Sequence, residues 1–140
     1  MADSNERGES LENISLAAAM ANSYARDQNG FAGLIAALLE ASLPGQTQVE
    51  RKPIRLFSQE KRVAQVTVTL GDEIYDLADP GHDKLPVATI QRIVRGITLK
   101  NERVGIDEWL RRLGDAIAEH AKHNQYASAA IMDYMRKVGL

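Results

Sequence analysis

The sequence predicts a single α+β domain in which helices from both ends of the chain pack on one face of an antiparallel sheet. Three observations predict this class: apolar residues at helical spacing over 10–43, alternation of apolar and polar residues over 47–104, and helical spacing again over 107–138. Because the apolar faces of these segments can meet in two layers, we expect a sheet of about four strands with helices on one face.

Length and composition are those of one globular domain. The chain has 140 residues, of which 44% are hydrophobic and 26% charged, so it can bury a core of its own. Residues 1–9 are polar and aperiodic, and we expect a flexible tail before a domain over 10–140. The apolar run over 31–43, about 13 residues, is shorter than the roughly 20 that a membrane span needs. Without cysteine there is no disulfide, which fits the cytoplasm.

Two helices are expected before the sheet. Apolar residues three and four apart predict the first helix over about 10–25, with Ser10 as its N-cap. A more apolar stretch over 31–43 predicts the second helix, which should end at Pro44. Because this second stripe is nearly free of charge, its helix should be central to the core.

The strongest local signal is a β-hairpin with the two-residue turn Gly71-Asp72. In this register four apolar side chains pair on one face, Val66 with Leu77 and Val68 with Tyr75. The opposite face carries Thr67, Thr69, Ile74 and Asp76. We therefore expect one face of the hairpin to be buried and the other to stay in contact with water.

Further strands are expected on both sides of this hairpin. A short strand around Val49 precedes it, and Pro53 interrupts that strand or marks a sheet edge. The segment 87–104 is also strand-like, but Gly96 interrupts its alternation. Arg95-Gly96 is either a turn between two short strands or a bulge at Gly96 within one long bent strand. We favour the bulge, because the apolar pairs of a hairpin do not line up well here.

A helical pattern closes the chain from 107 to 138. Asp107 is expected to cap its start, and Trp109 opens an apolar stripe that should lie on the sheet. The polar run 122–125 leaves two alternatives open, one long helix or two helices broken near Asn124. We predict that Trp109, the only tryptophan, is a structural anchor of this region.

The segment from Arg92 to Leu113 resembles a family of small uncharacterised bacterial proteins. In these proteins a VRGI-x-LK-x-E strand leads into a DEWL helix start. The matching residues here are Val94, Arg95, Gly96, Ile97, Leu99, Lys100, Glu102, Asp107, Glu108, Trp109 and Leu110. The resemblance covers about the second half of the chain, from Val63 onward. It implies a shared fold, with no function attached to it.

The best candidate for chemistry is the segment 119–123. Glu119, His120 and His123 lie within about one helical turn of one another and could hold a divalent metal. The segment lacks the H-E-x-x-H pattern and an obvious further ligand, however, and it is polar enough to be a solvated helix face. We predict no metal, no cofactor and no catalytic residue, and we favour a binding module over an enzyme.

Charged residues cluster in three segments. A basic stretch comprises Arg51, Lys52, Arg55, Lys61 and Arg62, and an acidic stretch comprises Asp72, Glu73, Asp76, Asp79 and Asp83. These are either solvated faces or an oriented protein contact. A further basic set, Arg92, Arg95, Lys100 and Arg103, could bind phosphates, but the segment 87–104 contains no aromatic residue on which bases could stack.

We predict a small intracellular protein-interaction or accessory module that binds a protein partner or a second copy of itself. The candidate interaction surface comprises Thr67, Thr69, Ile74, Arg92, Arg95 and Lys100. Two alternatives stay open: binding of a nucleic-acid backbone through a basic strand face, and a small metal-dependent enzyme that uses 119–123. The formal net charge of −2 offers no global attraction to nucleic acid, so any such binding would be local.

Overall fold

The computed structural model describes residues 16, 18–22, 24, 26, 30–81, 84–122 and 125–137. Residues 16, 18–22, 24 and 26 are helical, as predicted, whereas the predicted cap Ser10 lies outside the described residues. The elements that follow are α2 (Phe31–Ser42), β1 (Thr47–Pro53), β2 (Lys61–Leu70), β3 (Glu73–Ala78), β4 (Val87–Val94), β5 (Ile97–Val104), α3 (Ile106–Ala121) and α4 (Gln125–Lys137).

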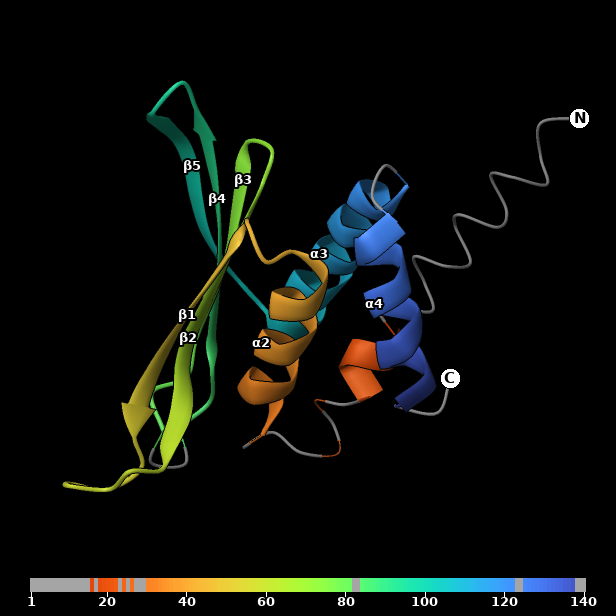
Figure 1. Ribbon diagram of the computed structural model, residues 1–140. Coiled ribbons are helices and arrows are strands. Elements are labelled where there is room, and N and C mark those ends of the chain that lie inside the picture. The colour runs from red at the N-terminus through yellow and green to blue at the C-terminus, as the bar shows by residue number, and fades with distance from the viewer. Residues whose placement is uncertain are drawn as a thin grey trace, which may run out of the picture.

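The five strands form one antiparallel sheet in the order β1-β2-β3-β4-β5, so each strand pairs with its neighbours along the chain. Figure 1 shows the described helices on one side of this sheet and none of them on the other. The predicted α+β fold, with helices on one sheet face, is confirmed. None of the described helices is long and apolar enough to cross a membrane.

The central hairpin has the predicted register. Val66 pairs with Leu77 and Val68 pairs with Tyr75, and all four side chains are buried. The turn residue Gly71 has a φ of 61°, a value that glycine adopts at little cost. The alternation of the sequence is therefore enough to decide which face of these strands meets the helices.

The sheet has five strands, and the expected bulge at Gly96 is wrong. Arg95 and Gly96 have φ values of 52° and 79° and form a tight turn between β4 and β5. The irregularity lies farther along the ladder, because Arg92 pairs with Lys100 while Ile93 pairs with Thr98. Leu99 is thereby an extra residue in β5. This shift explains why the apolar residues did not line up as a regular hairpin.

The helix ends differ in detail from the sequence expectations. Gly105, and not Asp107, is the N-cap of α3, and no side chain caps this end. Asp107 instead lies in the first turn, where its negative charge suits the helix dipole. The last segment could have been one long helix or two helices broken near Asn124, and the structure has two. The first, α3, ends at Ala121, and the second, α4, begins at Gln125. Pro53 ends β1 at the edge of the sheet.

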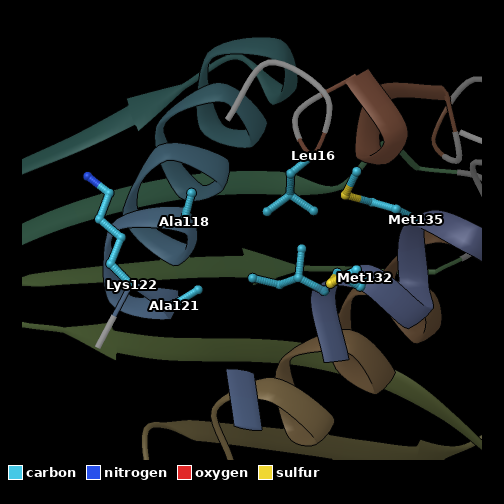
Figure 2. A pocket seen from close by; sticks show the side chains of 7 residues that line it. Leu16, Ala118, Ala121, Lys122, Met132 and Met135 are labelled. Atoms are coloured by element: carbon cyan, nitrogen blue, oxygen red, sulfur yellow. The ribbon is translucent and has the colours of Figure 1, made fainter. Parts of the chain in front are cut away.

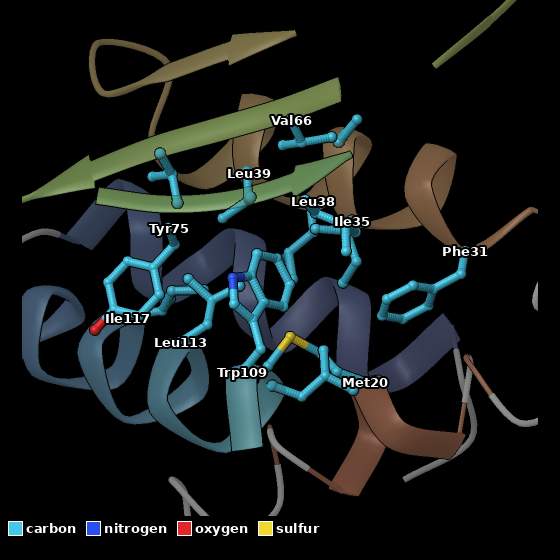
Figure 3. Packing of buried hydrophobic residues seen from close by; sticks show 14 of the residues in the cluster. Met20, Phe31, Ile35, Leu38, Leu39, Val66, Tyr75, Trp109, Leu113 and Ile117 are labelled. Carbon is cyan, nitrogen blue, oxygen red and sulfur yellow. The ribbon is translucent and has the colours of Figure 1, made fainter. Parts of the chain in front are cut away.

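The core lies between the sheet and the helices, and Trp109 is at its centre (Figure 3). The indole is fully buried, and its Nε1 donates a hydrogen bond to the backbone oxygen of Thr89 in β4, 3.3 Å away. The ring of Phe31 packs edge-on against Tyr24 at 5.0 Å between centroids. Trp109 therefore joins α3 to β4 by both packing and a hydrogen bond, as expected of an anchor.

Replacing Trp109 with alanine should destabilise the fold by about 3 to 5 kcal/mol, the usual cost of deleting a buried large aromatic side chain. Trp109→Phe should cost less, because it keeps most of the ring volume. Denaturant unfolding followed by far-UV circular dichroism measures both. Glu108→Ala, at the exposed neighbouring position, is the matched control and should change stability little. An unchanged midpoint for Trp109→Ala would contradict the anchor role.

Candidate functional site

The uncovered face of the sheet is a broad surface that no described helix contacts (Figure 1). Its central side chains come from alternate positions of the strands and form a polar row across the sheet. By the strand registers this row consists of Gln48, Thr67, Asp76, Thr89 and Arg103. The row is hydrophilic because the alternation that sends apolar residues to the core leaves polar residues here.

Asp76, near the middle of this face, accepts the hydrogen bonds that connect β2 and β3 there. Its Oδ1 accepts hydrogen bonds from Thr67 Oγ1 and from Gln65 Nε2, each at 2.7 Å. The carboxylate is thus held by two neutral donors on the neighbouring strand. The side chain of Arg103, at the end of the row on β5, is exposed and makes no hydrogen bond or ion pair with the described residues. The face therefore presents a fixed carboxylate near its centre and a free guanidinium at its edge.

The six residues predicted as an interaction surface lie in three different places. Thr67, Thr69 and Ile74 are together on the uncovered face, as the hairpin register requires. Arg92 and Lys100 pair across β4 and β5, and they line a hollow on the helix side with Ile90, Glu102 and Arg112. Arg95 is in the turn between these strands. Only the first three residues can belong to one contact on the uncovered face.

The basic set on β4 and β5 is divided in the same way. Arg92 and Lys100 are on the helix side, whereas Arg103 pairs with Thr89 on the uncovered face. The reason is the two-residue period of a strand, which sends neighbouring odd and even positions to opposite faces. These basic residues therefore do not form a single stripe along which a phosphate backbone could run.

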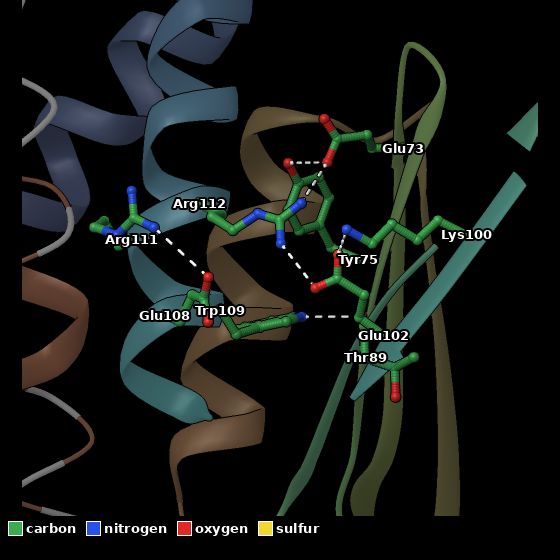
Figure 4. A network of polar contacts seen from close by, with 9 residues as sticks. All are labelled: Glu73, Tyr75, Thr89, Lys100, Glu102, Glu108, Trp109, Arg111 and Arg112. Atoms are coloured by element: carbon green, nitrogen blue, oxygen red, sulfur yellow. Dashed lines mark hydrogen bonds and ion pairs between the residues drawn. The ribbon is translucent and has the colours of Figure 1, made fainter. Parts of the chain in front are cut away.

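A charged cluster, which we define as Glu73, Tyr75, Lys100, Glu102 and Arg112, joins α3 to the sheet on the helix side (Figure 4). The Arg112 guanidinium lies 3.5 Å from Glu73 Oε2 and 3.6 Å from Glu102 Oε2. Lys100 Nζ lies 2.6 Å from Glu102 Oε1, and the Tyr75 hydroxyl donates to Glu73 Oε2 at 3.1 Å. A hollow of about 140 Å³ opens beside these groups.

The electrostatics of this cluster favour a structural role. The hydrogen bond from Lys100, helped by the charges of Lys100 and Arg112, lowers the pKa of Glu102, although partial burial opposes the shift. Burial, together with the neighbouring Glu73 carboxylate, raises the pKa of Tyr75 above its usual value. At neutral pH Glu102 is therefore ionised and Tyr75 is a neutral donor. A general acid or base would need a pKa near the working pH, which neither shift provides.

Local sequence did not reveal this cluster. Glu73 follows a hairpin turn, and its partner Arg112 is 39 positions away. Only the register of β3, β4 and β5 and the position of α3 on them bring the groups together. One sequence signal could have indicated the cluster: charged residues occupy strand positions that face the same side as the buried apolar residues. These residues are Glu73, Arg92, Lys100 and Glu102.

An apolar groove lies between α3, α4 and the helical residues near Leu16 (Figure 2). It has a volume of about 290 Å³, and its lining comprises Leu16, Ala118, Ala121, Lys122, Ile131, Met132 and Met135. Met132 is 62% exposed. Methionine side chains adapt to irregular surfaces, so this groove could accept apolar groups of varied shape. The sequence did not predict it, because it depends on how α4 packs.

The segment 119–123 is described only in part. Glu119 pairs with Lys122 at 2.7 Å between Oε2 and Nζ, and His120 is half-buried. His123 lies outside the described residues. Over the described part of the chain, no group of three or more residues is arranged to hold a metal ion. The metal alternative thus depends on His123, together with Glu119 and His120.

Comparisons with known proteins returned no matching family model, no matching curated protein and no matching solved structure. The resemblance of 92–113 to small bacterial proteins therefore stays an expectation. The case for function depends on the surfaces of this chain.

Acidification should remove the contribution of Glu102 to stability. Because its folded-state pKa is lower than the ordinary value of 4.5, the ionised group stabilises the fold above that pH, and this contribution is lost as the pH falls through the lowered pKa. We expect Glu102→Gln to be less stable than the wild type at neutral pH, with a difference that shrinks below about pH 4.5. Urea unfolding at a series of pH values measures this difference.

Lys100→Met tests the cause of the same effect. It removes the group that contributes most to the lowered pKa, so its stability should also approach that of the wild type on acidification. A difference between Glu102→Gln and the wild type that stays constant across the pH range would contradict the assignment.

Proposed function

We propose that this protein is a small protein-interaction module without catalytic activity, and that its contact surface is the uncovered sheet face together with the β5 edge. One observation carries the proposal: all the described helices lie on one face of the five-stranded sheet (Figure 1). The buried apolar residues of the sheet face the core, and no described helix lies on the second face, which a partner can therefore approach. A cytoplasmic location remains part of this prediction.

The chemistry of the uncovered face suits a polar, reversible protein contact. Asp76 is held in place by Thr67 and Gln65, so its carboxylate is oriented before a partner arrives. Ile74 is half-buried beside this polar row and supplies a small apolar area. Interfaces of reversible complexes combine such a small apolar centre with a hydrogen-bonding rim.

The β5 edge adds a second means of recognition. β5 is the last strand of the sheet, and six of its eight residues are exposed. An edge strand offers unpaired backbone N–H and C=O groups to which an extended segment of another protein can pair. Lys100 and Arg103 on this strand hinder indiscriminate pairing, because charges on an edge oppose aggregation. We therefore favour a protein partner that contributes an extended strand.

The alternatives have less support from the geometry. Binding of a nucleic-acid backbone needs several basic groups on one surface, and Arg92, Lys100 and Arg103 are on two faces. An enzyme needs a concave site with convergent polar groups and suitably shifted pKa values. The charged cluster has the polar groups, but its ion pairs hold Glu102 in its ionised form.

Site-specific photo-crosslinking in cells tests the proposal. A photoreactive amino acid at Thr69 on the uncovered face, or at Asn101 on β5, should yield a discrete protein adduct. The same group at Asp115, which is exposed on α3 at the helix side, is the matched control and should yield none. Adducts should survive nuclease treatment of the lysate. Adducts from Asp115 alone, or nucleic-acid adducts from Asn101, would contradict the proposal.

A further inference from the structure

The loop between β1 and β2 presents apolar side chains to solvent at an ordered turn. Leu56 is 85% exposed, Phe57 is 95% exposed and Ile54 is 52% exposed. The loop is closed by a backbone hydrogen bond from Ile54 to Glu60 at 2.9 Å, and its tip by one from Ser58 to Arg55 at 3.0 Å. Leu56 and Phe57, the most exposed large apolar residues of the described chain, are thus held at a defined position by these hydrogen bonds.

The backbone at this tip is strained. Phe57 has a φ of 65°, in the left-handed region that favours glycine or asparagine, while Leu56 before it has no positive φ. This is the pattern of a type II turn, in which glycine or asparagine usually occupies the position of Phe57. A large aromatic residue there costs conformational energy and gains no burial. Strain that is not offset by packing is typical of functional segments.

The flanks of the loop are strongly basic. Residues 51–62 contain five basic residues and one acidic residue, whereas the whole chain has a formal net charge of −2. Arg51 pairs with Glu40, and Arg62 donates to the backbone oxygen of Asp79. The side chains of Arg55 and Lys61 are exposed and make no hydrogen bond or ion pair with described residues. The apolar tip is therefore surrounded by free positive charge.

We infer that this loop is a membrane-surface anchor that binds bilayers containing anionic lipids. Leu56 and Phe57 enter the interfacial region of the bilayer, and Arg55 and Lys61 bind lipid phosphates. Apolar and aromatic residues partition into this region, and basic residues are attracted to its negative surface potential, each strengthening binding by about fivefold. Figure 1 shows the loop beyond the end of the sheet and away from the helices, so a flat surface can reach it.

A membrane accounts for these features better than a pocket in a protein partner. A protein pocket selects a particular side-chain shape, but it gives no reason for free basic groups on both flanks of the tip. A bilayer surface explains both the apolar tip and the basic flanks with one partner. The anchor is separate from the proposed protein-binding surface, because the β1–β2 loop projects beyond the end of the sheet (Figure 1) and β5 is at the edge opposite to β1.

Vesicle co-sedimentation of the full chain tests the inference. The protein should sediment with vesicles of equal parts phosphatidylcholine and phosphatidylglycerol, and should remain in solution with phosphatidylcholine alone. Raising the salt concentration should weaken binding, because the attraction to lipid phosphates is screened. Arg55→Glu combined with Lys61→Glu should abolish it. The inference is overturned if the wild type does not sediment with the anionic vesicles, which is the result expected if the loop inserts into a protein pocket. It is also overturned if the wild type sediments equally with both kinds of vesicle.

Phe57→Asn separates a membrane role from a structural one. Asparagine tolerates a positive φ, so the melting temperature should be unchanged or slightly raised. Vesicle binding should fall about tenfold or more, since a large apolar side chain no longer enters the bilayer. The matched control is Ile97→Ser, which removes an apolar residue that is 64% exposed at the opposite end of the sheet and should leave binding unchanged. Equal binding by Phe57→Asn and wild type would overturn the inference.

Discussion

Every strand of this sheet can direct only alternate side chains toward the helices, and the rest of the structure depends on that constraint. Val66, Val68, Tyr75 and Leu77 occupy the buried positions of the central hairpin, and α2 and α3 pack above them. Trp109 connects α3 to β4, because its ring is buried between them and its Nε1 donates a hydrogen bond to the sheet. The polar character of the opposite face follows from the same alternation, and so does the surface proposed for a partner.

The strand period also explains how charge is distributed. On β4 and β5 it sends Arg92 and Lys100 to the helix side, where Lys100 joins Glu102 and Arg112 in the charged cluster. It sends Arg103 to the uncovered face. Basic residues that look like one group in the sequence therefore have different surroundings: Lys100 pairs with the Glu102 carboxylate that Arg112 of α3 also contacts, and Arg103 is exposed at an edge that another chain can approach.

The two ends of the sheet differ in what they expose. At one end the β1–β2 loop carries apolar residues on a strained turn with basic flanks, and at the other the β4–β5 hairpin carries Ile97 and Leu99. Neither end is covered by a described helix (Figure 1). An anchor at one end and a protein-binding face between the ends would together hold a partner close to a membrane surface. This arrangement is consistent with an accessory role and requires no catalytic group.

The sequence by itself determined the α+β class, the order of helices and strands, and the register of the hairpin around Gly71, because alternation and turn chemistry are local properties. It did not determine the turn at Arg95-Gly96, since the extra residue Leu99 shifts the pairing and hides the hairpin pattern. Only the tertiary structure brought Arg112 to Glu73 and exposed Phe57 at a strained tip. Those features depend on packing between distant segments and on which side chains are left without neighbours, and no local pattern contains that information.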